Sequence, residues 1–275
     1  MLLTEAIELT RRCRETWRPG AKGYMTTIYN TNWCVEILNN PKIQDIRPLH
    51  IVEMQSKLIN LGKSPATVNR ICQALRTILN TARKMEVIDK VPHYDQLREP
   101  PGRTFIYTDE QEQLLYRSAL KLRNNAQLIH SILRFAFLTG ARQGEIVKLQ
   151  WDAINFEKNT ITFFDTKTSH NRVLPMPPTL RELMERLYHE RVDNTVFDIS
   201  KDRLIYYWKQ LKKKAGITEK DACFHSIRHT VCSRLWSKGC AQPDIMAVMG
   251  HTLVETTRRY SHATEEGIGN ALALL

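Results

Sequence analysis

Residues 225–230 read HSIRHT, so two histidines and an arginine stand at offsets 0, 3 and 4. In a helix this spacing puts His225, Arg228 and His229 on one side. Such a cluster repels itself unless an anion lies against it. A zinc site with His251 as third ligand is an alternative, but Arg228 would then press against the metal. A second alternative is that these residues are only the ordinary polar side chains of a helix start, with His229 as a structural, hydrogen-bonded histidine.

Arg142, in the stretch TGARQGEIVKL, is a further cation that could bind an anion. It follows Gly140, which we expect to end a helix over 126–139 as its C-terminal cap. Glu145 stands three residues on and can hold the guanidinium in place. Taken alone, the stretch is explained more simply by a surface ion pair between Arg142 and Glu145.

The stretch GHTLVETTRRYSH, residues 250–262, carries one more histidine and a tyrosine. His251 follows a glycine at the end of an expected helix, and Tyr260 stands beside Arg258 and Arg259. A lone tyrosine usually packs its ring on its own domain. A phenol beside two arginines near the end of the sequence is an unusual way to fill a core, which favours a chemical role.

The overall charge indicates the kind of anion. Lysine and arginine total 40 against 29 acidic residues, for a net charge of +11 over 275 residues. A polyanionic partner explains the excess, because phosphates bound by Lys and Arg release counterions; a solvated basic surface remains the alternative. Six cysteines without a C-x-x-C pair indicate reduced thiols. With no signal peptide and no apolar run of spanning length, we expect a cytoplasmic protein without a membrane partner.

The stretch LREPPGRTF, residues 97–105, divides the chain, because two prolines and a glycine cannot continue a helix. We place a helical domain at 1–97, a linker at 98–106 and a second domain at 107–275. In the first domain, Ser64-Pro65 predicts a helix start. An apolar stripe at 3–4 spacing follows: Val68, Ile71, Cys72, Leu75, Ile78, Leu79 and Ala82. The other side of this helix could read a DNA groove or be solvated; it carries Asn69, Arg70, Gln73, Arg76 and Thr77.

The second domain mixes helices with a small β-structure. Thr108 and Gln111 form a capping box. Residues 160–166 and 171–176 predict strands joined by a hairpin loop that contains Lys167. Further helices are expected at 178–192, 201–214, 226–238 and 242–249, and a short one through Glu145, Ile146 and Leu149. The predicted fold class is therefore mainly α with a small β-hairpin or sheet, in two domains.

Taken together, these stretches resemble the tyrosine recombinase, or phage-type integrase, family. Its motifs stand here in order as TGARQGE, DTKTSHNRVLP, HSIRHT and GHTLVETTRRY. Such an ordered set over more than a hundred residues is far more specific than any single motif. GKSPATVNR and LRTILNTARKMEVI also resemble the helical core-binding domain of the family, so the resemblance covers nearly the whole chain.

The resemblance assigns a role to each residue. It makes Tyr260 a nucleophile that forms a 3′-phosphotyrosyl link, and Lys167 the acid that protonates the leaving 5′-oxygen. The phosphate oxygens would be bound by Arg142, Arg228, His225 and His251, with Glu145 and His229 in support. His225 is also the expected partner for the Tyr260 proton. No metal or nucleotide cofactor is implied.

The resemblance also implies partners. In this family two domains clamp a DNA duplex and four protomers pair two sites, so we expect a homotetramer on double-stranded DNA; a monomer without DNA stays open. Basic residues of the first domain and the linker are candidate DNA contacts: Arg70, Arg76, Arg98 and Arg103. The tail after Tyr260 could dock on its own domain or on a neighbouring protomer.

Because the helical pattern begins almost at Met1, we expect the arm-binding domain of many integrases to be absent. We therefore expect a simple, nucleoid-associated integrase of a phage or mobile element. Xer-type chromosome dimer resolution and type IB topoisomerase activity are enzymatic alternatives. A DNA-binding protein on an inactive recombinase fold is the non-enzymatic one, but it would require a lost catalytic residue.

Overall fold

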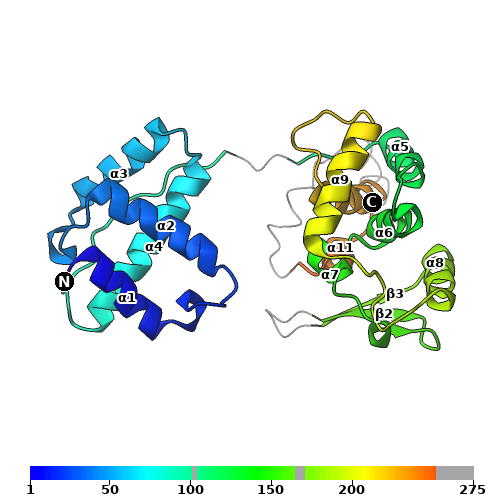
Figure 1. Ribbon diagram of the computed structural model, residues 1–275, viewed down its shortest axis with the longest axis horizontal. Helices are drawn as coiled ribbons and strands as arrows, with labels where there is room; N and C mark the ends of the chain where they lie inside the picture. Colours follow the sequence, from blue (N-terminus) through cyan, green and yellow to red (C-terminus); the bar gives the residue numbers. More distant parts are fainter. Residues whose placement is uncertain (101–103, 165–170, 252–275) are drawn as a thin grey trace, which may run out of the picture. The chain divides into compact units, whose positions relative to one another are not determined.

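Apolar side chains of the described residues pack separately on each side of the Pro-Pro-Gly stretch, with a smaller third cluster in the second part. The computed structural model describes residues 1–100, 104–164 and 171–251 (Figure 1). It divides into two units, Met1–Gly102 and Arg103–Leu275. Each unit has its own cluster of buried apolar side chains.

The N-terminal unit is a helical bundle, blue to cyan in Figure 1. Its α-helices are α1 (Leu3–Cys13), α2 (Tyr24–Leu38), α3 (Pro48–Asn60) and α4 (Pro65–Lys84), with 3-10 turns at Glu15–Trp17 and Ile43–Asp45. The Ser64 hydroxyl caps α4 by accepting a hydrogen bond from the Thr67 backbone N–H at 3.3 Å. The apolar stripe predicted along α4 is buried, as expected.

Asn69 corrects our prediction for the other side of α4. Its side chain is only 6% exposed, so it cannot face a DNA groove. The amide nitrogen of Asn69 donates to the Leu97 carbonyl at 2.8 Å, and its oxygen accepts from the Leu97 N–H at 2.9 Å. The amide nitrogen also donates to Glu99 at 2.8 Å. The chain after α4 therefore folds back over this side of the helix, which sequence periodicity does not reveal.

The C-terminal unit is mainly helical with one small sheet. Its α-helices are α5 (Asp109–Leu120), α6 (Ala126–Thr139), α7 (Gln143–Ile146), α8 (Pro178–His189), α9 (Lys201–Lys214), α10 (Phe224–Ser237) and α11 (Gln242–Met249). The predicted capping box of α5 is present, since Gln111 N–H donates to the Thr108 hydroxyl and Thr108 N–H to the Gln111 side chain. Leu149 lies beyond α7, which is shorter than expected.

The sheet has one more strand than the predicted hairpin. Its antiparallel order is β1 (Ile154–Asn155), β2 (Thr160–Phe163) and β3 (Arg172–Pro175), after a 3-10 turn at Trp151–Ala153. The two residues of β1 are too few for an alternation pattern to appear in the sequence. The mainly α fold with a small sheet is confirmed.

The first residues of the C-terminal unit attach it to α10. Tyr107 is buried, and its backbone N–H donates to the Thr230 hydroxyl at 2.8 Å. Its phenol donates to the Cys223 carbonyl at 3.0 Å, at the residue that precedes α10. The start of this unit thus fixes the helix that carries HSIRHT, which begins at Phe224 rather than 226 and so includes His225.

Within the described residues, no helix is both long and apolar enough to cross a membrane. All six cysteines are in the described ranges, and each is a free thiol. Within those ranges, no group of three or more His, Cys, Asp or Glu side chains is placed to hold a metal ion.

We expect Asn69→Ala to lower the free energy of unfolding of the N-terminal unit by about 1–3 kcal/mol, because it leaves the Leu97 N–H and carbonyl without their partner. Urea titration of the full chain measures this. Gln73→Ala, an exposed change on the same helix, is the control and should stay within about 0.5 kcal/mol of wild type. Equal losses in the two variants would show that Asn69 does not secure the returning chain.

Candidate active site

The turn after α6 places Arg142. The Thr139 hydroxyl donates to the Phe135 carbonyl at 2.7 Å and accepts from the Ala141 N–H at 3.2 Å. Gly140 ends α6 with φ +61°, a left-handed conformation that favours glycine. The chain therefore reverses at the expected position, and Arg142 becomes the N-cap of α7.

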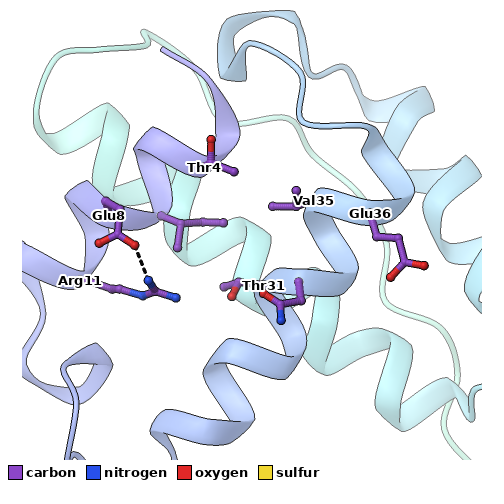
Figure 2. Close-up of a pocket in the computed structure, with 8 residues that line it drawn as sticks. Thr4, Glu8, Arg11, Thr31, Val35 and Glu36 are labelled. Carbon is purple, nitrogen blue, oxygen red and sulfur yellow. Dashed lines mark hydrogen bonds and ion pairs between the residues drawn. The ribbon is translucent and has the colours of Figure 1, made fainter.

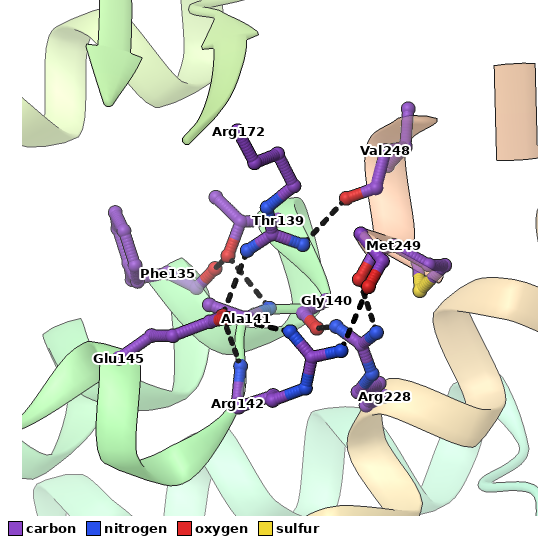
Figure 3. Close-up of polar contacts among 11 residues, drawn as sticks. Phe135, Thr139, Gly140, Ala141, Arg142, Glu145, Arg172, Arg228, Val248 and Met249 are labelled. Carbon is purple, nitrogen blue, oxygen red and sulfur yellow. Dashed lines mark hydrogen bonds and ion pairs between the residues drawn. The ribbon is translucent and has the colours of Figure 1, made fainter. Parts of the chain in front are cut away.

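Glu145 binds two arginines, as Figure 3 shows. Its Oε1 accepts from Arg142 Nη1 at 2.7 Å, and its Oε2 accepts from the Arg142 backbone N–H at 2.7 Å. The predicted pairing with Arg142 is therefore present. Oε2 also accepts from Arg172 Nη2 at 2.7 Å. Arg172 was not among the predicted site residues; it stands in NRVLP, where the pattern predicted only a strand.

Arg228 lies in the interior, 5% exposed, on α10. Its Nη1 donates to the Gly140 carbonyl at 2.8 Å, and its Nη2 donates to the Met249 carbonyl. These carbonyls belong to the ends of α6 and α11, where backbone oxygens lack helical partners and carry partial negative charge. One buried guanidinium therefore joins the carboxyl ends of two helices.

Three successive carbonyls at the end of α11 each accept a hydrogen bond from a different arginine; Figure 3 labels the first two, Val248 and Met249. Arg172 Nη1 donates to Val248 at 2.7 Å, Arg228 to Met249, and Arg142 Nη2 to Gly250 at 2.8 Å. The Gly250 backbone has φ +63°. A Cβ there would lie 3.2 Å from Arg172 Cδ, so close approach as well as conformation favours glycine.

His251 follows this fixed helix end, and the cations around it change its protonation. Burial, then the charges of Arg228, Arg142 and Arg172, lower the pKa of His251 to about 4. Burial likewise lowers the pKa of Arg228 to about 9, with further lowering by Arg142 and Arg172, while Glu145 opposes the shift. His251 is therefore neutral near pH 7 and can donate a hydrogen bond without adding a charge.

His225 and His229 lie together on α10, their ring centroids 4.9 Å apart in an edge-to-face arrangement. This agrees with the predicted shared side of the helix. His225 occupies the first turn, where a helix end favours an anion. Loss of water around its ring, followed by the charges of Arg228 and Arg142, lowers the pKa of His225.

The balance of charge in this cluster favours an anionic ligand. Arg142, Arg172 and Arg228 are three guanidinium groups, and Glu145 is the carboxylate that pairs with two of them. The Arg142 side chain remains 40% exposed, so solvent or a ligand reaches it. A phosphate group fits this chemistry, because guanidinium donors match its oxygens in pairs.

The remaining predicted residues are placed as follows. Lys167, Tyr260 and Arg103 lie outside the described residues, as does the tail after Tyr260. Arg70 and Arg98 are exposed. Arg76 is half-buried, with its guanidinium carbon 4.7 Å from the centroid of the Tyr94 ring.

A separate hollow of about 400 Å³ lies between α1 and α2 in the N-terminal unit (Figure 2). Its lining mixes apolar and polar side chains, among them Ile7, Val35 and an ion pair between Arg11 and Glu8. It contains none of the predicted catalytic residues, and we assign no ligand to it.

Comparisons with known proteins show the family of this chain. The model of the phage integrase family matches residues 104–266, more than half of the chain. A XerC-like tyrosine recombinase of Caldanaerobacter subterraneus subsp. tengcongensis is 26% identical, over 85% of this chain and 72% of its own length. A shufflon-specific DNA recombinase of Escherichia coli is 25% identical, over 88% of this chain; the chain spans only 64% of that longer protein.

Solved structures share the fold over almost the whole chain. Tn1549 transposon integrase (residues 82–397) in complex with circular intermediate DNA has a TM-score of 0.79 at 19% identity, covering 99% of both chains. A lambda integrase tetramer bound to a Holliday junction has a TM-score of 0.77 at 17% identity, covering 92% of this chain and 78% of the other. The resemblance seen in the sequence is thus confirmed, and the chain belongs to the phage integrase family of tyrosine recombinases.

Proposed function

We propose that this protein is a site-specific DNA recombinase that cuts and rejoins strands through a 3′-phosphotyrosyl intermediate. The observation that carries the proposal is the convergence of Arg142 and Arg228, from two distant parts of the sequence, at the end of α11 beside His251. Donors fixed in this way stabilise charge that develops on a phosphate during reaction.

The two arginines can bind phosphate without leaving their protein partners. A guanidinium has five N–H donors. Arg142 donates to Glu145 and to the Gly250 carbonyl, and Arg228 donates to the Gly140 and Met249 carbonyls. Arg142, whose side chain is 40% exposed, presents its remaining donors to a ligand directly; Arg228 is buried, and in the proposed reaction a remaining donor of this residue reaches a non-bridging oxygen, in a direction fixed in advance by its protein contacts.

Tyr260 is the proposed nucleophile. Its phenolic oxygen attacks phosphorus in line, a P–O bond to tyrosine forms, and the bond to the 5′-oxygen of the next nucleotide breaks. Lys167 gives a proton to that 5′-oxygen, and His225 accepts the proton from Tyr260. Attack by the 5′-hydroxyl of a partner strand then reverses the chemistry, so no external energy source is required. Motif order supports these three assignments.

The DNA partner is a duplex in the proposed reaction. The N-terminal unit is the core-binding domain, residues 1–97, with Arg70, Arg76 and Arg98 as candidate backbone contacts; Arg103 belongs to the linker, 98–106. The catalytic domain is 107–275. Solved structures of similar fold are integrases bound to DNA, one of them a tetramer, which supports a homotetramer on paired sites. We propose that the protein is cytoplasmic and associated with the nucleoid.

Integration of a phage or mobile element is the narrower role that we propose. Chromosome dimer resolution of the Xer type is the alternative, because XerC-like and XerD recombinases are similar to this chain as well. A type IB topoisomerase would relax supercoiled plasmid without exchanging strands. Sequencing of the products from a supercoiled two-site plasmid distinguishes relaxation from recombination.

We predict a covalent protein–DNA adduct that depends on Tyr260. A pool of nicked suicide duplexes with a randomised central segment lets the protein itself select the sequence that it cleaves. Wild-type protein should yield an adduct resistant to denaturation, and Tyr260→Phe should yield none, because it lacks the attacking oxygen. An adduct of equal yield in Tyr260→Phe would exclude Tyr260 as the nucleophile.

Arg142→Ala and Arg228→Ala should each slow adduct formation on the selected duplex about 10²–10³-fold, the loss typical of one oxyanion donor. Arg228→Ala should also lower the melting temperature, because it leaves the buried Gly140 and Met249 carbonyls unpaired. Gel-shift affinity should change little in either. Arg117→Ala, an exposed change on α5, is the control. A normal cleavage rate in either site variant would show that its arginine does not stabilise the phosphate during the reaction.

A further inference from the structure

Arg172 is a buried arginine that the proposed chemistry does not yet use. It opens β3 directly opposite Phe163 on β2, and its guanidinium carbon lies 4.4 Å from the centroid of that ring. Its side chain is 9% exposed. Burial of a charged side chain is costly unless the charge is paired and hydrogen-bonded, so its partners explain its position.

Those partners are Glu145, which also binds Arg142, and the same helix end to which Arg142 donates. Arg172 Nη2 donates to Glu145 Oε2 at 2.7 Å, and that oxygen also accepts from the Arg142 backbone N–H. Arg172 Nη1 donates to the Val248 carbonyl at 2.7 Å, two residues before the Gly250 carbonyl that Arg142 binds. Both arginines therefore donate hydrogen bonds to the Glu145 carboxylate, drawn in Figure 3, and to carbonyls at the end of α11.

We infer that Arg172 is a positioning residue. Its planar guanidinium group fixes Glu145 and the end of α11 relative to each other. These two groups in turn orient the Arg142 guanidinium toward the phosphate. The inference rests on the proposed function. The same contact fixes the chain at His251, which directly follows Gly250. Without Arg172, Glu145 and α11 would each still contact Arg142, but they would lose the two hydrogen bonds that tie them to the first residue of β3.

The chemistry of the fork explains why this residue is an arginine. Two donors in one rigid plane reach a carboxylate and a carbonyl together, whereas the ammonium of lysine is a single point of charge on a flexible stem. At metal sites, loss of a group that orients a metal ligand typically costs about 10–100-fold in affinity or activity, and we expect a loss of similar size for a group that orients Arg142. Arg172→Lys therefore keeps the charge but removes the simultaneous hydrogen bonds to Glu145 and to the Val248 carbonyl.

The first test measures chemistry apart from binding. On the selected nicked duplex at saturating concentration, Arg172→Lys and Arg172→Met should form adduct about 10–100-fold more slowly in single turnover. Gel-shift affinity for the same duplex should stay within about twofold, because Arg172 is not a contact to the DNA backbone in this account. Arg181→Met is the matched control: that arginine also binds a carbonyl and a carboxylate, those of Phe156 and Glu185, away from the site.

Normal cleavage by folded Arg172→Lys overturns the inference, and so does a loss of affinity that accounts for the whole effect. If Arg172→Met does not fold, Arg172→Lys decides alone. A different result would contradict the proposed function itself: wild-type protein would give no adduct that depends on Tyr260.

The second test needs no DNA. The Gly250 and His251 backbone N–H groups donate into the last turn of α11, to the Ala247 and Met246 carbonyls. Hydrogen exchange of these two amides should quicken about tenfold in Arg172→Lys, because the helix end then opens more readily, and should be unchanged in Arg181→Met. Unchanged exchange in Arg172→Lys would show that Arg172 does not fix this helix end.

Discussion

The carboxyl end of α11 is the feature on which the site depends. Arginines from β3, α10 and the turn before α7 would repel one another if only their own charges were present. The Val248, Met249 and Gly250 carbonyls carry the partial negative charge of a helix end, and they draw the three guanidinium groups to one place. Glu145 supplies the full negative charge that secures two of them. A cluster assembled in this way remains positive overall, which suits it to a phosphate.

This arrangement links the fold to the reaction. The attraction for carbonyls sets the guanidinium directions before DNA binds, so little reorganisation remains for the chemical step. The close approach and the left-handed backbone both favour glycine at 250, where a Cβ would lie 3.2 Å from Arg172 Cδ. Tyr107 fixes α10 from the start of the same unit through Thr230 and Cys223. Contacts between residues that are far apart in the sequence thus determine the positions of Arg142 and Arg228.

Most of the helices could be predicted from the sequence, because caps and apolar spacing are local signals. Gly140, the Thr108 capping box and the stripe on α4 were each predicted correctly for this reason. The offsets in HSIRHT likewise predicted a shared helix side for His225 and His229. Arg172 and Asn69 could not be placed, because their partners, Val248 and Leu97, lie 76 and 28 residues away. Long-range contacts of this kind leave no periodic trace in a single sequence.

The most direct test of the account is the structure of Tyr260→Phe bound to its selected DNA duplex, with the distances from the scissile phosphate to the two arginines measured. Non-bridging oxygens should lie about 3 Å from Arg142 and Arg228 nitrogens, while both arginines keep their carbonyl partners on Gly250 and Met249. A phosphate bound elsewhere, with both guanidinium groups directed only at the protein, would contradict it.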